Sequence, residues 1–391
     1  MDKFKRIFVI VIDSVGAGAA LDAKDYGDEG TNTLKHASFG KADFSIPNLY
    51  KLGIGNITLV NNTPANPNAL ASFGVLKEIS NGKDTLTGHW ELMGLNVRDP
   101  FPTFTDTGFP DELIEEIKKL SGRGVIGNCN ASGTEIIKEL GEEQLKTGDL
   151  IVYTSADSVL QIAAHEEKIP LTELYEICSK VRELTLAHKE WMVGRIIARP
   201  YVGTNSSNFK RTPNRHDYSV KPFAKTTLNY LQEAGFDVIG IGKIRDIFDG
   251  EGITKTYKNL SNVDGMNHCI EVANSDFNGL CFVNLVDFDA MYGHRRDPLG
   301  YANCLEEFDA KLGELLPLIG EDDLLMITAD HGNDPTHTGT NHTRENVPIL
   351  MYSPSLEAKD LGIRDSFADV GRTIEENFDV TVNEYGKSLL K

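Results

Sequence analysis

The sequence predicts an α/β protein built on a mainly parallel sheet flanked by helices, because long apolar runs alternate with helical patterns. The runs span Ile7–Asp13, Leu280–Asp289 and Leu324–His331, and each is rich in Val, Ile, Leu or Phe. Near-continuous apolar runs of this kind are typical of strands that are buried on both faces. Between them lie segments with apolar residues at spacings of three and four, for example Tyr301–Leu318, as expected for helices that cover such a sheet.

The length of 391 residues predicts two domains, because one hydrophobic core rarely grows to this size. The stretch from about 102 to 217 differs from its surroundings. It has Gly-rich loops, amphipathic helical segments at Asp111–Leu120 and Thr172–Leu186, and short strands at Leu150–Thr154 and Gly194–Ala198. We interpret residues 102–217 as a smaller α+β cap domain inserted into a discontinuous core of residues 1–101 and 218–391, with Pro-containing segments as hinges.

Composition argues against several classes of function. Acidic residues (58) outnumber basic residues (39), and a net charge of -19 would repel nucleic acid and anionic membranes. No apolar stretch approaches the ~20 residues that a membrane-spanning helix needs. The five cysteines are widely spaced and form no CxxC pair, which argues against a disulfide framework or a thiolate zinc site and favours the reducing cytoplasm.

Each of the three predicted strands delivers a carboxylate to its carboxyl end, namely Asp13, Asp289 and Asp330. Ligands of open α/β sheets bind beyond these strand ends, because the connecting loops converge there. A single Asp in this position is ordinarily a helix cap or a turn residue. Three of them, each accompanied by Gly or His, favour a ligand site.

Histidines near these carboxylates predict a metal centre. Asp330 and His331 are adjacent and are followed by His337 and His342, while His294 lies five residues after Asp289. Oxygen and imidazole ligands without thiolate favour manganese, magnesium, zinc or iron. With Asp13 there are enough ligands for two ions, which could hold the attacking and leaving oxygens of a phosphoryl transfer.

One choice of ligand stays open at this point. Asp287 and Asp289 would share one face of a strand, so spacing does not decide which of them faces a metal.

A candidate nucleophile is Thr85, in the segment GKDTLTGHWELMG. A Gly-Lys-Asp turn precedes it, and it lies where a short helix is expected to begin, so free backbone amides could stabilise a phosphoryl group. Threonine is a poor nucleophile at neutral pH and would need a metal to activate it. The alternative is that Thr85 only caps the helix.

Eight motifs together resemble those of the phosphopentomutases of the alkaline phosphatase superfamily, over essentially the whole chain. They are IDSVGAG, GKDTLTGHWELMG, YTSADSVLQIAAHEE, IARPYVG, RTPNRHDY, GKIRDIFDGEG, NLVDFDAMYGHRRD and TADHGNDPTHTGTNHTRE. The resemblance implies an alkaline phosphatase-like core and two manganese ions bridged by Thr85, with magnesium or zinc also compatible with the ligand types. The implied ligands are Asp13, Asp330 and His331 for one ion, and Asp289, His294 and His342 for the other.

The resemblance also implies the reaction. A sugar bisphosphate activates the enzyme by phosphorylating Thr85, which passes its phosphoryl group to a ribose or deoxyribose phosphate and recovers one from the bisphosphorylated sugar. The implied substrate-binding residues are Ser155, Asp157, Arg195, Arg211 and Lys243. The chain departs from the family pattern at Cys129-Asn130, where Lys-Pro is usual, and at Leu21, where Pro is common.

Three other functions remain as alternatives. A cofactor-independent phosphoglycerate mutase shares the two-metal core but uses serine, so Thr85 and the YTSAD motif disfavour it. A phosphomonoesterase would release inorganic phosphate if water entered the site. A non-catalytic metal or sugar-phosphate binder would be favoured only if a ligand or Thr85 were missing. The residues leave open the choice between ribose and deoxyribose, the native metal and the oligomeric state.

Overall fold

The structure, a computed structural model, describes residues 4–155 and 157–391. The chain divides into two compact units, a core unit of Met1–Pro100 with Pro222–Lys391 and an inserted unit of Phe101–Lys221. The sequence placed these junctions after residues 101 and 217. The role of the inserted unit as a substrate-binding cap stays a prediction.

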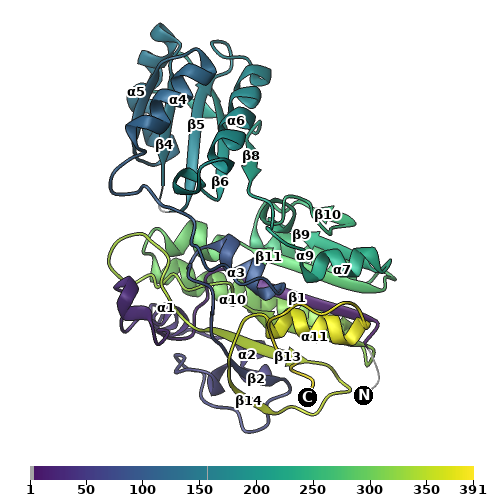
Figure 1. The fold of residues 1–391 in the computed structure, drawn as a ribbon. Coiled ribbons are helices and arrows are strands. Elements are labelled where there is room, and N and C mark those ends of the chain that lie inside the picture. The colour runs from purple at the N-terminus through teal and green to yellow at the C-terminus, as the bar shows by residue number, and fades with distance from the viewer. Residues whose placement is uncertain (1–3, 156) are drawn as a thin grey trace. The chain divides into compact units, whose positions relative to one another are not determined.

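Eight strands of the core unit form one sheet, in the order β10-β9-β11-β1-β12-β13-β2-β14 (Figure 1). Neighbouring strands are parallel except where β13 pairs with β12 and with β2. The predicted α/β class with a mainly parallel sheet is therefore confirmed. In sheet order the strands are β10 (Lys255–Tyr257), β9 (Asp237–Ile241), β11 (Gly279–Leu285), β1 (Arg6–Ile12), β12 (Asp323–Thr328), β13 (Val347–Tyr352), β2 (Ser72–Leu76) and β14 (Asp360–Arg364).

The three predicted strands are central in this sheet, and each ends earlier than predicted. β1 lies between β11 and β12, so the carboxyl ends of all three strands meet at one edge. They end at Ile12, Leu285 and Thr328, because the chain turns out of the sheet before the acidic residues. After β11 the segment Phe288–Gly293 is a π-helical turn, so the expectation that Asp287 and Asp289 share a strand face is wrong.

Helices of the core unit form two packing groups. In one group α1, α2 and α9 contact α10, and in the other α3 contacts α8 and α11 while α7 contacts α11. Because β11 and β12 are buried along their whole length, the two groups cover opposite faces of the sheet. The helices are α1 (Thr33–Phe39), α2 (Pro47–Leu52), α3 (Thr85–Leu92), α7 (Thr227–Glu233), α8 (Ile244–Ile247), α9 (Asn262–Ala273), α10 (Pro298–Leu315) and α11 (Asp369–Phe378).

The predicted helix at 301–318 begins earlier and ends sooner in the structure. The side chain of Asp297 accepts a hydrogen bond from the backbone of Gly300, and Pro298 occupies the first turn, where its missing N–H is not needed. The α-helix ends at Leu315, and a 3-10 turn over Leu316–Leu318 follows.

The inserted unit is a second sheet with helices on both faces. Its strand order is β3-β4-β5-β6-β7, with β8 also paired to β6. Along β4 alternate residues face opposite sides: Val152 packs in the cluster with α4 and α6, and Ile151 in the cluster with α5. The elements are β3 (Val125–Asn130), β4 (Leu150–Thr154), β5 (Val159–His165), β6 (Arg195–Val202), β7 (Lys210–Arg211), β8 (His216–Ser219), α4 (Asp111–Ser121), α5 (Gly133–Thr147) and α6 (Leu171–Leu186).

The unusual pair Cys129-Asn130 ends β3, beside Tyr153 and Thr154 of β4. All five cysteines are free thiols; Cys129 is exposed and the other four are buried. Among the helices of the described residues, none has the length and apolar character needed to cross a membrane.

Candidate active site

The first predicted ligand set comes together at the carboxyl edge of the central strands. Asp13 directly follows β1, and Asp330 and His331 follow β12 after one intervening residue. One side-chain atom from each of the three lies within 4.8 Å of the others, and all three residues are buried. The Nε2 atom of His331 is 3.6 Å from Asp13 Oδ1 and 3.3 Å from Asp330 Oδ2.

The second predicted set also converges, and its carboxylate is Asp289. The Nε2 atom of His294 is 3.0 Å from Asp289 Oδ2, and that of His342 is 3.3 Å from Asp289 Oδ1. Asp287 instead accepts a hydrogen bond from the backbone of Asn262 at 2.7 Å. The π-helical turn after β11 therefore decides the choice that spacing left open.

The two sets adjoin one another. The rings of His331 and His342 stack with centroids 3.8 Å apart, and Asp289, His331 and His342 also have ligand atoms within 4.8 Å of one another. His337, in the segment between His331 and His342, belongs to neither set, and its Nε2 atom lies 3.5 Å from Asp28 Oδ1.

Backbone carbonyls orient the three histidines. The Nδ1 atoms of His331, His342 and His294 lie 3.0, 2.9 and 2.7 Å from the carbonyl oxygens of Gly332, Lys83 and Thr340. A carbonyl oxygen can only accept, so each Nδ1 carries the proton. When these rings are neutral, each Nε2 lone pair faces the carboxylates, which is the usual arrangement of imidazole metal ligands.

The charges at the site fit divalent cations. Asp13 Oδ1 is buried and has no hydrogen-bond partner among the described residues. Burial, together with the negative charges of Asp330 and Asp289, raises the pKa of Asp13 to about 7. Burial opposes protonation of His331, but Asp330, Asp13 and Asp289 outweigh it and raise its pKa to about 9. Asp289 and Asp330 instead have lowered pKa values, so they are ionised beside Asp13. Three crowded carboxylates with imidazole nitrogens and no thiolate suit manganese, magnesium or zinc.

Thr85 is the first residue of α3, and its hydroxyl lies at the cluster of predicted metal ligands. The Thr85 Oγ1 atom is 3.3 Å from His331 Nε2. The alternative that Thr85 caps the helix is wrong, because Asp84 is the cap and accepts from the Thr87 backbone at 3.1 Å and from its hydroxyl at 2.6 Å. The Thr85 hydroxyl therefore faces the site at the positive end of a helix.

Glycine at position 88 lets α3 approach the ligand segment. A Cβ atom added to Gly88 would lie 2.0 Å from the carbonyl oxygen of Asp330. Helix α3, which begins with Thr85, thus rests directly on the backbone that carries Asp330 and His331.

His89 and Asn284 support the site, and the sequence reasoning did not assign them. His89 Nδ1 is 2.9 Å from the Thr85 carbonyl oxygen and 3.1 Å from Asp330 Oδ2. Asn284 donates to Asp13 Oδ2 at 2.8 Å and lies 3.3 Å from His89 Nε2. The spacing of four from Thr85, which puts His89 on the same helix face, was the signal that could have found it.

Comparisons with known proteins identify the family. The sequence model of the Metalloenzyme superfamily matches residues 5–382. Proteins of Clostridium tetani and Clostridium beijerinckii, both named phosphopentomutase, are each 57% identical to this chain, over 100% of it and 99% of their own length. The chain belongs to the phosphopentomutase family. The resemblance seen in the sequence motifs is therefore confirmed, and the chain is an enzyme, an isomerase of the intramolecular phosphotransferase kind.

The predicted alkaline phosphatase-like fold is also confirmed. Among solved structures, the PH0037 protein from Pyrococcus horikoshii superposes with a TM-score of 0.50 at 14% identity, over 99% of this chain and 100% of that chain. At this identity the likeness shows a common fold alone.

The predicted substrate-binding residues of this family member lie in both units. In the inserted unit, Arg195 Nη2 is 2.8 Å from Asp157 Oδ2, and Ser155 Oγ accepts a weak hydrogen bond from Gln161 at 3.4 Å. Arg211, exposed, ends β7. The structure thus pairs Asp157 with Arg195.

Lys243 lies in the core unit, two residues beyond β9, so it emerges at the same sheet edge as the carboxylates.

Arg199 is a further cation that the sequence reasoning did not single out. Its Nε donates to Gln161 at 2.9 Å. Burial, with repulsion from Arg215 and Arg211, lowers the pKa of Arg199 to about 10. Arg199, Arg211 and Arg215 therefore lie near enough to repel one another, and Asp217, paired with Arg215, offsets part of their charge.

Proposed function

We propose that the chain interconverts the 1-phosphate and 5-phosphate of ribose or deoxyribose through a phosphothreonine at Thr85. The observation that carries this proposal is the 3.3 Å distance between Thr85 Oγ1 and His331 Nε2, beside two carboxylate-imidazole clusters. The clustering supports a metal-dependent phosphoryl transfer, and the full-length relatives named phosphopentomutase support the substrate class.

The two clusters would each hold one divalent ion, manganese in our proposal, with magnesium or zinc as alternatives. Their ligands would be Asp13, Asp330 and His331 for the first, and Asp289, His294 and His342 for the second. When bound, such ions lower the pKa of a hydroxyl and neutralise charge on transferring phosphoryl oxygens.

In each proposed transfer, one phosphorus–oxygen bond forms and one breaks. A hydroxyl of the sugar monophosphate loses its proton as its oxygen bonds to the phosphorus, while the bond to Thr85 Oγ1 breaks and leaves its electron pair on that oxygen. The sugar then carries two phosphates. In the return step Thr85 Oγ1 bonds to the other phosphorus while the bond from that phosphorus to its sugar oxygen breaks, and the released oxygen keeps the electron pair and takes up a proton. The sugar leaves isomerised, and the enzyme is phosphorylated as before.

Residues of the chain would position the substrate. The first-turn amides of α3 face the phosphoryl group on Thr85. The non-transferring phosphate would bind to Arg195, Arg211 and Lys243, with Ser155 and Asp157 at the sugar hydroxyls, and the inserted unit would act as a cap. Arginine provides paired donors for a phosphate and lysine a point charge.

A sugar bisphosphate would activate the enzyme by phosphorylating Thr85 for the first time. We place the enzyme in the cytoplasm, in keeping with its five free thiols. Its partners would be small sugar phosphates, since the net charge of -19 disfavours nucleic acid and anionic membrane surfaces.

Substitution at Thr85 tests the proposal. Thr85→Ala should bind two ions as before, gain no phosphate from a sugar bisphosphate in intact-mass spectrometry, and convert no ribose 5-phosphate to ribose 1-phosphate. Thr85→Ser keeps a hydroxyl and should retain measurable phosphorylation. Phosphate on the Ala variant would disprove the nucleophile assignment, and steady release of inorganic phosphate by the unmodified chain would indicate a phosphomonoesterase instead.

A further inference from the structure

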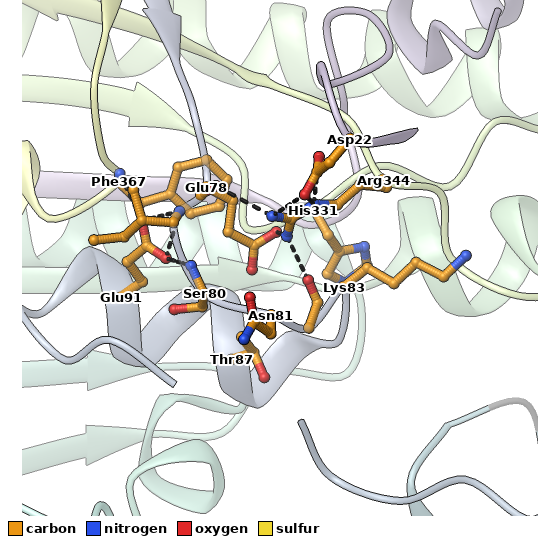
Figure 2. Close-up of polar contacts among 12 residues, drawn as sticks. Asp22, Glu78, Ser80, Asn81, Lys83, Thr87, Glu91, His331, Arg344 and Phe367 are labelled. Atoms are coloured by element: carbon orange, nitrogen blue, oxygen red, sulfur yellow. Dashed lines mark hydrogen bonds and ion pairs between the residues drawn. The ribbon is translucent and has the colours of Figure 1, made fainter. Parts of the chain in front are cut away.

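Arg344 is a buried cation next to the ligand cluster that the proposed reaction does not use. It is 2% exposed and lies two residues after His342. Its guanidinium extends toward the loop Glu78–Lys83, and this loop leads into Asp84, the cap residue of α3. Figure 2 shows the guanidinium between Asp22 and Glu78. Within the described residues, its hydrogen bonds go to Asp22, Glu78 and Gly82, none of which is a predicted metal ligand.

The guanidinium holds the loop Glu78–Lys83 at both of its ends. Nη1 donates to the Glu78 carboxylate at 2.5 Å and to the Gly82 carbonyl at 2.6 Å, and Nη2 donates to the Glu78 carbonyl at 3.1 Å. Nε and Nη2 also donate to Asp22 at 3.0 to 3.2 Å. All the donors of one planar group are therefore used, and the group bridges the loop to a separate segment of the core unit.

Other bonds fix the same loop. His342 Nδ1 donates to the Lys83 carbonyl at 2.9 Å, so one short segment carries both a predicted metal ligand and two anchors of the loop. From the other side Glu91 accepts from the backbones of Ile79 and Ser80 at 2.8 to 3.1 Å (Figure 2). The backbone before Thr85 is thus held on both sides.

Stability alone does not explain a charged group at this position. Two ions that leave water lose hydration energy, and a buried ion pair often stabilises a fold no better than a packed apolar pair would. An apolar side chain, however, could not bond to the Glu78 and Gly82 carbonyls. A lysine ammonium could reach one or two of these acceptors but lacks the planar fork that serves all of them.

We infer that Arg344 is a positioning residue, which sets the place of Thr85 relative to the metal ligands by fixing the loop Glu78–Lys83 to the His342 segment. This inference rests on the proposed role of Thr85 as the phosphoryl acceptor. Arg344 acts through the backbone of the loop, and its loss displaces the Thr85 hydroxyl without removing a ligand or a substrate contact.

The test compares Arg344→Lys with a matched control, Arg6→Lys. Arg6 makes a comparable bidentate pair with Asp323, at 2.7 Å for both bonds, and also donates to two carbonyl oxygens at 2.9 Å. It lies at the start of β1, at the other end of that strand from Asp13. Both substitutions should lower the melting temperature by similar amounts.

The two variants should differ in turnover. Arg344→Lys should bind two manganese ions, keep KM within about twofold and lose about 100-fold in kcat, the effect of a displacement of about 1 Å at the reacting atom. Its peptides covering residues 78–83 should exchange amide hydrogens faster than in the parent. Arg6→Lys should keep the parent kcat and the parent exchange at 78–83.

Several results would overturn the inference. They are an unchanged kcat in Arg344→Lys, an equal loss of kcat in Arg6→Lys, or unchanged exchange in the loop. If Arg344→Lys does not fold, Asp22→Asn serves instead, because the Asp22 side chain is 44% exposed and bonds only to the outer side of the guanidinium. The Asp22→Asn variant should have a severalfold lower kcat at constant KM. An unchanged kcat in this variant would count against the inference. Activity in Thr85→Ala would refute the proposed nucleophile separately, whatever the Arg344 variants do.

Discussion

Replacing Gly88 by Ala puts a methyl group between helix α3, which carries the proposed nucleophile Thr85, and the segment that carries Asp330. The added carbon would lie 2.0 Å from the Asp330 carbonyl oxygen, whereas real Cβ contacts essentially never fall below 3.0 Å. The obstacle is backbone, which cannot rotate away as a side chain can. The helix α3, or the segment after β12, must therefore move by at least about 1 Å, the difference between 3.0 and 2.0 Å.

This displacement falls on the proposed nucleophile, Thr85. Thr85 is one helical turn before Gly88, so a shift of α3 moves its hydroxyl away from His331, from which it is now 3.3 Å distant. A misplacement of about 1 Å at a reacting centre lowers turnover about 100-fold. Overpacking destabilises by about 1–3 kcal/mol, and the better helix propensity of Ala recovers about 0.5–1 kcal/mol of that.

The assay measures kcat for the conversion of ribose 5-phosphate to ribose 1-phosphate, bound metal, and stability by urea unfolding. We expect kcat to fall about 100-fold, while a net loss of about 0–2.5 kcal/mol in the free energy of unfolding leaves the protein folded. Gly141→Ala is the matched control, because its added carbon would meet the Phe209 ring at 2.6 Å within the inserted unit. The steric reasoning fails if Gly88→Ala keeps full turnover, or if Gly141→Ala loses as much.

Two further predictions concern the metal ions. Asp289→Ala should retain one of two manganese equivalents on equilibrium dialysis, because it removes the carboxylate shared by His294 and His342; retention of both equivalents would reject Asp289 as a ligand. Manganese affinity, measured by chelator competition, should rise with pH. The metal must displace the proton of His331, whose pKa is about 9, and below about pH 7 it must also displace the proton of Asp13. The manganese association constant should increase about tenfold per pH unit between pH 7 and 9, and more steeply below pH 7. An association constant that does not change with pH would contradict the charge arrangement.

Much of the core was predictable because its strands carry a strong and local signal. The strands at the centre of the sheet are six or seven residues long and mostly apolar, so their burial and parallel pairing follow from composition and alternation with helices. The carboxylates that come after them must then meet at one sheet edge. That inference needs no knowledge of loop conformation, and Asp13, Asp330 and His331 do lie together.

Loop geometry was less accessible from the sequence. The predicted strand through Asp289 ended at Leu285, and only the π-helical turn that follows turns Asp289, rather than Asp287, toward the histidines. The supporting residues differ in this respect. Arg344 acts through backbone carbonyls that are distant in the sequence, and no spacing rule connects it with Gly82. His89 bonds to the carbonyl of Thr85, four residues before it, so its helical spacing was a usable signal.

The positions of the missed residues indicate two groups in the site, residues that would contact metal or phosphate and residues that hold the first group in place. Residues recognisable from the sequence are those that would touch metal or phosphate, because their side-chain chemistry is specific. The residues that hold them include main-chain atoms among their partners: His89 bonds to the carbonyl of Thr85, and Arg344 to those of Glu78 and Gly82. Every residue type offers the same backbone carbonyl, so the identity of the accepting residue gives no hint of such a bond. Only the donating side chain can be recognised in the sequence. Substitutions at such donors should therefore change turnover more than binding, since they move groups without removing them.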